Sequence, residues 1–197
     1  MMRRGDGQND GGARDWDLVA RARAGDMDAF AQLVTRYQAP VIHYCRRMVG
    51  ATQDAEEIAQ DSFVRVYRHL GRLKPKARFS TFLFGVARNL ALNFLRDAGR
   101  RGRGVTGSID AQPALGDDAR RPDRTARLHE IETMIELGLQ RISAEHREIL
   151  VLRELNGLDY DSIAEVLRCR KGTVKSRLAR AREQLRIQIE ALGGGAL

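Results

Sequence analysis

The chain has 197 residues, of which 43% are hydrophobic and 30% charged, and a formal net charge of +8. This length allows one ordinary domain or two small ones, and no run approaches the ~20 consecutive apolar residues of a membrane span. We therefore expect a globular cytoplasmic protein without membrane insertion, whose positive charge favours a polyanionic partner.

The beginning of the chain and its two cysteines give no sign of secretion or of a metal site. Residues 1–14 are polar and Gly-rich without an apolar core, which predicts a disordered leader and argues against a secretory signal. Cys45 and Cys169 form no CxxC pair and have no histidine partners at metal-ligand spacing. We expect both thiols to pack in a reducing cytosol, and we expect neither a metal nor a cofactor.

The charge is divided into two basic stretches with an acidic one between them. Residues 62–96 contain eight Lys or Arg and no acid, and residues 168–186 contain eight against a single Glu. Residues 128–167 carry nine acids against three Arg. Two basic stretches on one chain predict two separate nucleic-acid contacts.

Residues 15–98 have the periodicity of a helical bundle, and no alternating run is long enough to predict a strand. Pro40 should kink or split the second helix, and Glu57 has capping-box spacing from the start of the third. Four residues are predicted to cap successive helices: Asp15, Asp26, Asp54 and Ser80.

The helical pattern stops over residues 99–127, where Gly, Pro, Arg and Asp dominate. This stretch buries too little apolar surface to offset its ordering entropy, so we expect a flexible linker. A second helical domain is expected over residues 128–191, with a Gly-rich tail over 192–197. The predicted fold class is all-α, with two small helical domains joined by the linker.

The second domain has the pattern of a helix-turn-helix. Ser143 can cap a helix that ends at Asn156-Gly157, and Asp159 can cap the next. The short turn 168–170 then leads to a strongly basic helix over about residues 171–189. At ~100° per residue, this helix has a narrow apolar stripe: Val174, Leu178, Ala181 and Leu185.

The opposite face of the basic helix suits a DNA major groove. Gly172, Ser176 and Ala179 are small enough for a close approach to base edges, while Lys175 and Arg180 beside them can reach phosphates or guanine. A merely solvated basic helix is the alternative. The tight turn, the apolar stripe and the small residues coincide here, and together they predict that this helix reads DNA.

Cations and aromatic side chains are interleaved in the first basic stretch, a composition that suits single-stranded nucleic acid. Phe94 falls on an apolar face and is expected in the core, whereas Phe79, at the end of the loop 72–78, is the better candidate for stacking on a base. Asn89 and Asn93 share one helix face and could bond the edges of extruded bases. Exposed polar residues without function are the alternative.

Acidic residues stand at the start of the third predicted helix. They either compensate the helix dipole or dock a basic partner protein beside apolar neighbours, and the residues alone leave both possibilities open. The acids are Asp54, Glu56, Glu57 and Asp61, and the neighbours are Ile58, Phe63 and Val64.

Three blocks of sequence stand out: DAEEIAQDSFVRVY at 54–67, FSTFLFGVARNL at 79–90 and GTVKSRLARARE at 172–183. In this order and at this separation, they closely resemble bacterial sigma factors of the extracytoplasmic function (ECF) group. The resemblance covers both predicted helical domains.

This resemblance implies a transcription initiation factor rather than an enzyme. The first domain corresponds to a sigma-2 domain, which binds the clamp helices of the polymerase β′ subunit and captures flipped bases of the melted −10 element. The second corresponds to a sigma-4 domain, which reads the −35 element and docks on the β flap, with the linker directed towards the RNA exit path. Captured bases favour the open duplex without nucleotide hydrolysis. Members of the group are usually held inactive by an anti-sigma factor, which is therefore an expected partner.

The resemblance also assigns residues to each surface. Those for core polymerase are Asp54, Glu57, Ile58, Asp61, Phe63 and Val64. Those for the −10 element and melting are Arg72, Lys74, Lys76, Arg78, Phe79, Phe82, Arg88, Asn89 and Asn93. Those for the −35 element are Arg170, Lys171, Thr173, Lys175, Ser176, Arg177, Ala179 and Arg180. Phe82 stands where relatives commonly have Trp, and Ala179 where they often have a bulkier residue. The resemblance therefore leaves base stacking by Phe82 and the exact −35 sequence open.

Two other classes of protein were weighed. A one-component or response regulator can also end in a helix-turn-helix, but the first domain shows no βα alternation and no phosphoacceptor Asp at a strand end. An enzyme needs a catalytic motif, and we find no GxxxxGK[ST], HExxH or GxSxG and no clustered carboxylate–His set. A stand-alone regulator should bind its operator by itself, whereas a sigma factor should need core polymerase.

Overall fold

The computed structural model describes residues 7–50, 52–100 and 122–193, which form helices joined by short turns. The first bundle contains α1 (Gly7–Arg23), α2 (Met27–Val49), α3 (Thr52–Arg68), a 3-10 turn η1 (Leu70–Arg72) and α4 (Phe79–Arg100). The second contains α5 (Pro122–Arg141), α6 (Ala144–Leu150), a π-helical segment η2 (Val151–Leu155), α7 (Tyr160–Leu167) and α8 (Lys171–Ala191). No strand occurs in these ranges, and the all-α prediction is confirmed.

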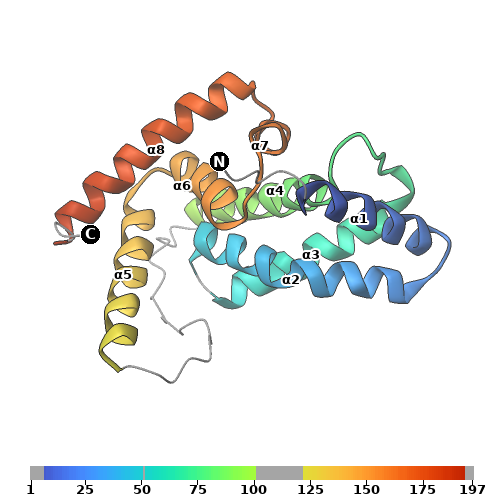
Figure 1. Ribbon diagram of the computed structural model, residues 1–197, viewed down its shortest axis with the longest axis horizontal. Helices are drawn as coiled ribbons and strands as arrows, with labels where there is room; N and C mark the ends of the chain where they lie inside the picture. The colour runs from blue at the N-terminus through green and yellow to red at the C-terminus, as the bar shows by residue number, and fades with distance from the viewer. Residues whose placement is uncertain (1–6, 51, 101–121, 194–197) are drawn as a thin grey trace.

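Each bundle is organised around one long helix. In the first, α2 packs against α1, α3 and α4, and in the second, α8 packs against α5, α6 and α7 (Figure 1). Helix continues beyond the predicted domain limits, so that both ends of the predicted linker 99–127 are helical, while its residues 101–121 lie outside the described ranges. Among the described residues, no helix is both long enough and apolar enough to cross a membrane.

Asp15 does not cap α1, contrary to prediction, because the helix begins upstream of it. The buried Asp15 carboxylate instead accepts hydrogen bonds from Arg36 and Tyr37 of α2. Once the buried turns of α1 are fixed in the core, extra turns upstream need no new nucleus. The predicted disordered leader, residues 1–14, is accordingly helical from residue 7 on, and its first six residues lie outside the described part.

The remaining predicted caps divide into two groups. Asp26, Ser143 and Asp159 do cap α2, α6 and α7, and their side chains accept from backbone N–H groups at 3.0, 3.3 and 2.8 Å. Asp54 and Ser80 are not caps, because α3 and α4 each begin one or two residues earlier. Asp54 lies in the first turn of α3 instead, where its carboxylate interacts favourably with the helix dipole.

Helix α2 continues through Pro40 and is not split, contrary to one of the two predicted outcomes. Proline removes one backbone hydrogen bond from a helix. The apolar side chains on both sides of it, Leu33 before and Val41 and Tyr44 after, are fully buried in the same core. Their burial holds both halves of α2 in one helix.

The two bundles pack against each other. Helix α4 contacts α7, and the C-terminal half of α2 lies against α5, α6 and η2. The buried side chains of both bundles form one continuous hydrophobic cluster. The basic surface of the first domain therefore faces the second domain along part of its length.

Candidate nucleic-acid interface

Helix α8 has the two faces that its sequence predicts. Val174, Leu178 and Ala181 are at most 1% exposed and pack against α6 and α7, while Leu185 is half-buried. The opposite face is exposed: Gly172, Lys175, Ser176, Ala179 and Arg180. The apolar stripe thus holds the small residues and their flanking cations outward on a rigid support.

The turn between α7 and α8 is fixed by local geometry. Arg168 ends α7 in the left-handed conformation, with φ of 52°, and Cys169 N–H donates to the Ala164 carbonyl at 2.9 Å. Side-chain Nζ of Lys171 then pairs with Oδ2 of Asp161 at 2.7 Å. These contacts set the angle between the two helices, as a helix-turn-helix requires.

Not all the cations predicted for the −35 element face outward. Arg170, Lys175 and Arg180 are exposed, and so is Lys171 despite its ion pair. Thr173 is half-buried, and its carbonyl accepts from Ser176 at 3.2 Å. Arg177 turns towards α6 and pairs with Glu145 at 3.1 Å, which leaves its side chain 22% exposed.

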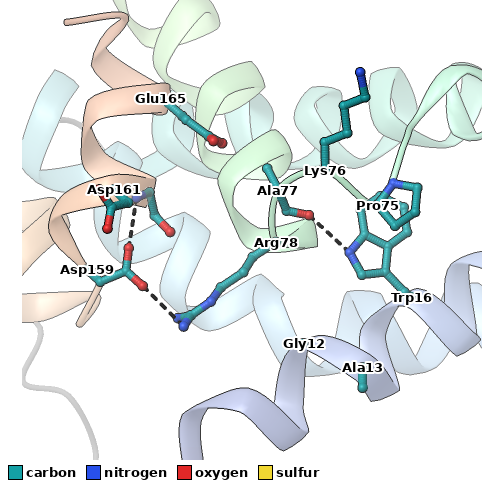
Figure 2. A pocket seen from close by; sticks show the side chains of 11 residues that line it. Gly12, Ala13, Trp16, Pro75, Lys76, Ala77, Arg78, Asp159, Asp161 and Glu165 are labelled. Carbon is teal, nitrogen blue, oxygen red and sulfur yellow. Dashed lines mark hydrogen bonds and ion pairs between the residues drawn. The ribbon is translucent and has the colours of Figure 1, made fainter. Parts of the chain in front are cut away.

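A basic loop precedes α4 and is held in place by α1. Trp16 Nε1 donates to the Ala77 carbonyl at 3.0 Å, as Figure 2 shows, and Arg23 donates to the carbonyls of Leu70 and Leu73. The predicted cations Arg72, Lys74 and Lys76 are exposed around these anchors. Sequence reasoning did not assign Trp16 and Arg23, although Trp16 is the single Trp of the chain.

Phe79 is not available for stacking on a base, contrary to prediction. It is fully buried, and its ring lies 5.6 Å from the ring of Tyr37. The prediction placed Phe79 in the loop, but α4 begins at this residue, and its first turn directs the ring into the core. Phe82 is half-buried and meets Trp16 edge-on at 6.0 Å, so this aromatic pair lies beside the loop instead.

The polar residues predicted on α4 have different surroundings. Asn89 and Asn93 are exposed, and Asn93 accepts a hydrogen bond from Arg96. Arg88 lies under the second domain, with Nε 2.7 Å from Oε1 of Glu148 and only 20% of its side chain exposed. Arg78, at the end of the loop, pairs with Asp159 of α7 at 3.1 Å.

The contact of Arg88 with Glu148 is a buried ion pair. Glu148 is 2% exposed, and its Oε1 also accepts from the Tyr44 hydroxyl at 3.1 Å. Burial raises the pKa of Glu148 above its ordinary value, although Arg88 opposes this shift. Burial also raises the pKa of Tyr44, which keeps its proton for the hydrogen bond to Glu148.

The residues assigned to a polymerase contact on α3 are only partly accessible. Glu57, Asp61 and Val64 are exposed, and Asp54 is half-buried. Ile58 and Phe63 are each 7% exposed and belong to the core. Contrary to prediction, they are not contacts on the surface, because their side chains support α3 from within.

An exposed apolar group that sequence reasoning did not assign continues this face of α3. Tyr67 and Met27 are 41% and 57% exposed, and the Tyr67 hydroxyl donates to the Met27 sulfur at 3.2 Å. The Tyr67 ring also lies 4.9 Å from that of Phe30. Together with Val64, these side chains extend the surface beside the acids. The sequence gave no strong indication of this apolar group, because polar residues separate its members along the chain.

These features define an all-helical, two-domain DNA-binding protein with a helix-turn-helix in the second domain. The comparisons are more specific. The Sigma-70 region 2 family matches residues 33–101, and the Sigma-70 region 4 family matches residues 133–185. The chain belongs to the ECF group of RNA polymerase sigma factors. It is an alternative sigma factor, which is a transcription initiation factor.

Relatives of similar length support this membership. The chain is 38% identical to the RNA polymerase sigma-H factor of Pseudomonas aeruginosa, over 87% of this chain and 92% of the relative. It is 34% identical to the ECF RNA polymerase sigma-E factor of Haemophilus influenzae, over 90% and 96% of the two chains. It is 31% identical to the ECF RNA polymerase sigma factor SigW of Bacillus subtilis, over 88% and 96%.

Solved structures show the same fold. CnrH in complex with the cytosolic domain of CnrY matches with a TM-score of 0.66 and 25% identity, over 90% of this chain and 98% of that one. The sigma factor RpoE in complex with the anti-sigma factor NepR, from Bartonella quintana, matches with a TM-score of 0.67 and 22% identity, over 82% and 96%.

Proposed function

We propose that this sigma factor directs core polymerase to −35/−10 promoters through four surfaces, two for promoter DNA and two for polymerase. The observation that carries the −35 assignment is the outer face of α8. Ser176 and Ala179 are exposed at its centre, with Lys175 and Arg180 beside them and a buried stripe behind. Small side chains allow the helix to approach base edges, and the cations bind phosphate or guanine.

The −10 surface consists of the basic loop and the adjoining face of α4. Lys74 and Lys76 neutralise the backbone of the melted strand, and Asn89 offers an amide to an extruded base. The exposed cations and amides support this role, as does the Trp16–Phe82 pair beside the loop. The surface favours melting because it binds only the open form of the duplex, and a ligand shifts an equilibrium towards the state that it binds.

Core polymerase binds a third surface, on α3. Glu57 and Asp61 present exposed carboxylates, with Val64 and Tyr67 as apolar neighbours, for the clamp helices of β′. Charged groups at such a contact contribute orientation and association rate, while the apolar side chains contribute affinity.

The second domain docks on the β flap. An open groove between α6 and α8 offers the half-buried Leu185 and Ile189 for this contact, with the buried Leu150 behind them. This groove and the −35 face use different residues of α8, so the second domain can bind polymerase and promoter together.

Control by an anti-sigma factor completes the proposal. CnrH was solved in complex with the cytosolic domain of CnrY, and RpoE in complex with the anti-sigma factor NepR. The likeness in sequence and architecture to CnrH supports a similar partner for this chain. We further propose that the protein acts in the cytoplasm and catalyses no reaction of its own.

Run-off transcription with purified core polymerase on a genomic fragment library tests this function. Discrete new start sites, each preceded by a shared −35/−10 pair, are expected only when the protein is added. Tight duplex binding without polymerase, and no new starts, would contradict the proposal and favour a stand-alone regulator. The Lys175→Ala/Arg180→Ala variant is the matched control, because it should bind polymerase and still lose the −35-dependent starts.

A further inference from the structure

Two carboxylates of the second domain form ion pairs with cations of the proposed −10 surface. Glu148 on α6 lies against Arg88, and Asp159 at the start of α7 lies against Arg78. Glu148 also accepts from Tyr44 of the first domain, so its carboxylate is enclosed by groups from across the interface. Carboxylate oxygens of the second domain thus pair with two cations assigned to the −10 element.

The surfaces around these pairs are complementary in charge. A shallow groove of about 430 Å³ separates the basic loop from α7 (Figure 2). Lys76 and Arg78 line one wall, and Asp159, Asp161 and Glu165 line the other. The second domain thus lies against this side of the loop, whereas Lys74 and Lys76 remain exposed.

A second set of contacts joins the domains at the end of α2. Arg147 of α6 donates to the carbonyls of Arg47 and Met48, both at 3.4 Å. Those carbonyls belong to the last turn of α2, where backbone acceptors lack helical partners. Glu136 of α5 pairs with Arg46 at 3.4 Å and lies 3.8 Å from Arg47. The closed arrangement therefore has specific polar contacts at two separate places.

The −35 surface takes no part in these contacts. Lys175, Ser176, Ala179 and Arg180 are all exposed on the outer face of α8, and the ion pairs of Arg177 and Arg182 stay within the second domain. Closure consequently affects the two DNA surfaces differently.

We propose that the closed arrangement is an autoinhibited state, in which Glu148 and Asp159 stand in for DNA on the −10 surface while the −35 surface stays open. The inference rests on the proposed −10 role of Arg78 and Arg88. A free chain can then meet duplex DNA through α8, but it captures a melted strand only after the domains separate.

The energetics of the pair suit a switch. Burying a carboxylate costs free energy that the attraction to Arg88 offsets only in part, and the raised pKa of Glu148 reflects that cost. This cost reduces the net stability that the contacts between the domains give the closed state. The domains then separate when polymerase binds each of them at its own site, or when a polyanion competes for the cations.

The first experiment measures the distance between the domains in the full-length chain. Spin labels are placed at Gln60 on α3 and Gln184 on α8, both exposed, in a Cys169→Ser background in which Cys45 stays buried. The otherwise wild-type chain should give one narrow distance distribution. Glu148→Arg should give a longer and broader one, because it places two cations together in a buried site.

Two variants distinguish the contact of Glu148 with Arg88 from a general effect of net charge. Glu154→Arg makes the same change in net charge at an exposed position whose partner, Arg182, is in the same domain, and it should leave the distance unchanged. The swap Arg88→Glu with Glu148→Arg restores opposite charges and should restore the narrow distribution. A broad distribution in the parent chain, or identical ones in the parent and Glu148→Arg, would overturn the closed state and leave the transcription result unaffected.

The second experiment measures binding of a fluorescein-labelled single strand of about 12 nucleotides and mixed sequence. Glu148→Arg should bind it roughly tenfold more tightly than the Glu154→Arg control, which carries the same net charge. An open chain with no such gain would overturn the inhibitory role. Adding Arg88→Ala to Glu148→Arg tests the −10 assignment itself. Loss of the gain in single-strand affinity supports the assignment, and retention of the gain overturns it. The distances between the labels still report whether Glu148 holds the domains together.

Discussion

Nε of Arg88 on α4 and Oε1 of Glu148 on α6 lie 2.7 Å apart, although the two residues belong to different domains. The carboxylate of Asp159 stands in the same relation to Arg78. In both pairs the cation comes from the surface proposed for single-stranded promoter DNA. The same side chains therefore serve either contact between the domains or contact with DNA, and the two states exclude each other.

Replacing both Lys175 and Arg180 by Ala should abolish −35-dependent binding without loss of core polymerase binding. A side chain that reaches a base edge contributes about 1–3 kcal/mol of discrimination, whereas the polymerase contacts proposed on α3 lie in the other domain. Arg182→Ala is the control, because that exposed side chain on the same helix is paired with Glu154. Gel-shift assays with polymerase holoenzyme report −35 binding, and co-purification reports core binding. Loss of core binding in the double variant would show that the two surfaces are misassigned.

Phe79 and Phe82 should respond differently to substitution by Ala. Phe79 is fully buried, so Phe79→Ala should lower the free energy of unfolding by about 3–5 kcal/mol. Phe82 is half-buried against Trp16, and its truncation should cost about 1–2.5 kcal/mol, for the lost ring pair and half a side chain's burial. Promoter opening, followed by permanganate reactivity of unpaired thymines, should fall in Phe82→Ala at a temperature where this variant is folded. Normal opening in that variant would exclude stacking by Phe82.

Local patterns predict most of this fold. The caps at Asp26, Ser143 and Asp159 depend on residues three positions apart, and the stripe of α8 depends on helical periodicity, so the sequence alone identifies them. Asp15 and Phe79 were misplaced because partners on another helix, Tyr37 among them, decide their surroundings. Tertiary contacts of this kind leave no local pattern.

The closed interface illustrates the same limit. Glu148 resembles any other acid in an acidic stretch, and nothing nearby in the sequence marks it as the partner of Arg88. Its burial follows only from the packing of α6 against α2. The sequence predicted surfaces for both promoter elements and for polymerase, and it could not predict that Arg78 and Arg88 of the −10 surface pair with the second domain.

Trp16→Phe should loosen the basic loop while preserving the core. The substitution keeps a ring beside Phe82 but removes the N–H that donates to the Ala77 carbonyl, at a cost of about 1 kcal/mol. Amide hydrogen exchange should accelerate across residues 73–78 and stay unchanged in α8. Single-strand binding by the opened Glu148→Arg chain should weaken with it. Unchanged exchange across the loop would mean that its other anchor, Arg23, suffices.

Acidification should favour the closed state through Glu148. Burial raises the pKa of Glu148 in the closed chain above its ordinary value of 4.5, with Arg88, Tyr44 and Arg177 as the ionisable groups acting on it. The closed form therefore binds this proton more tightly than an open form in which the carboxylate is hydrated. The resulting stabilisation is fully present below the ordinary pKa and is lost as the pH rises through the raised one.

The fraction of short distances between the labels at Gln60 and Gln184 should consequently increase as the pH is lowered towards the ordinary pKa of Glu148. Glu148→Gln removes the titrating group and keeps an acceptor for Tyr44, so it should abolish the increase. His43 must be controlled, because burial and then Arg47 and Arg46 lower its pKa, and its protonation adds positive charge near the same interface. In a His43→Gln background the increase should come from Glu148, whereas Asp159, whose pKa is lowered in part by Arg78, favours the open state once the pH falls far enough to protonate it. A closed fraction that falls on acidification in that background would contradict burial as the dominant influence on this carboxylate and would assign the stability of the closed state to its ion pair with Arg88.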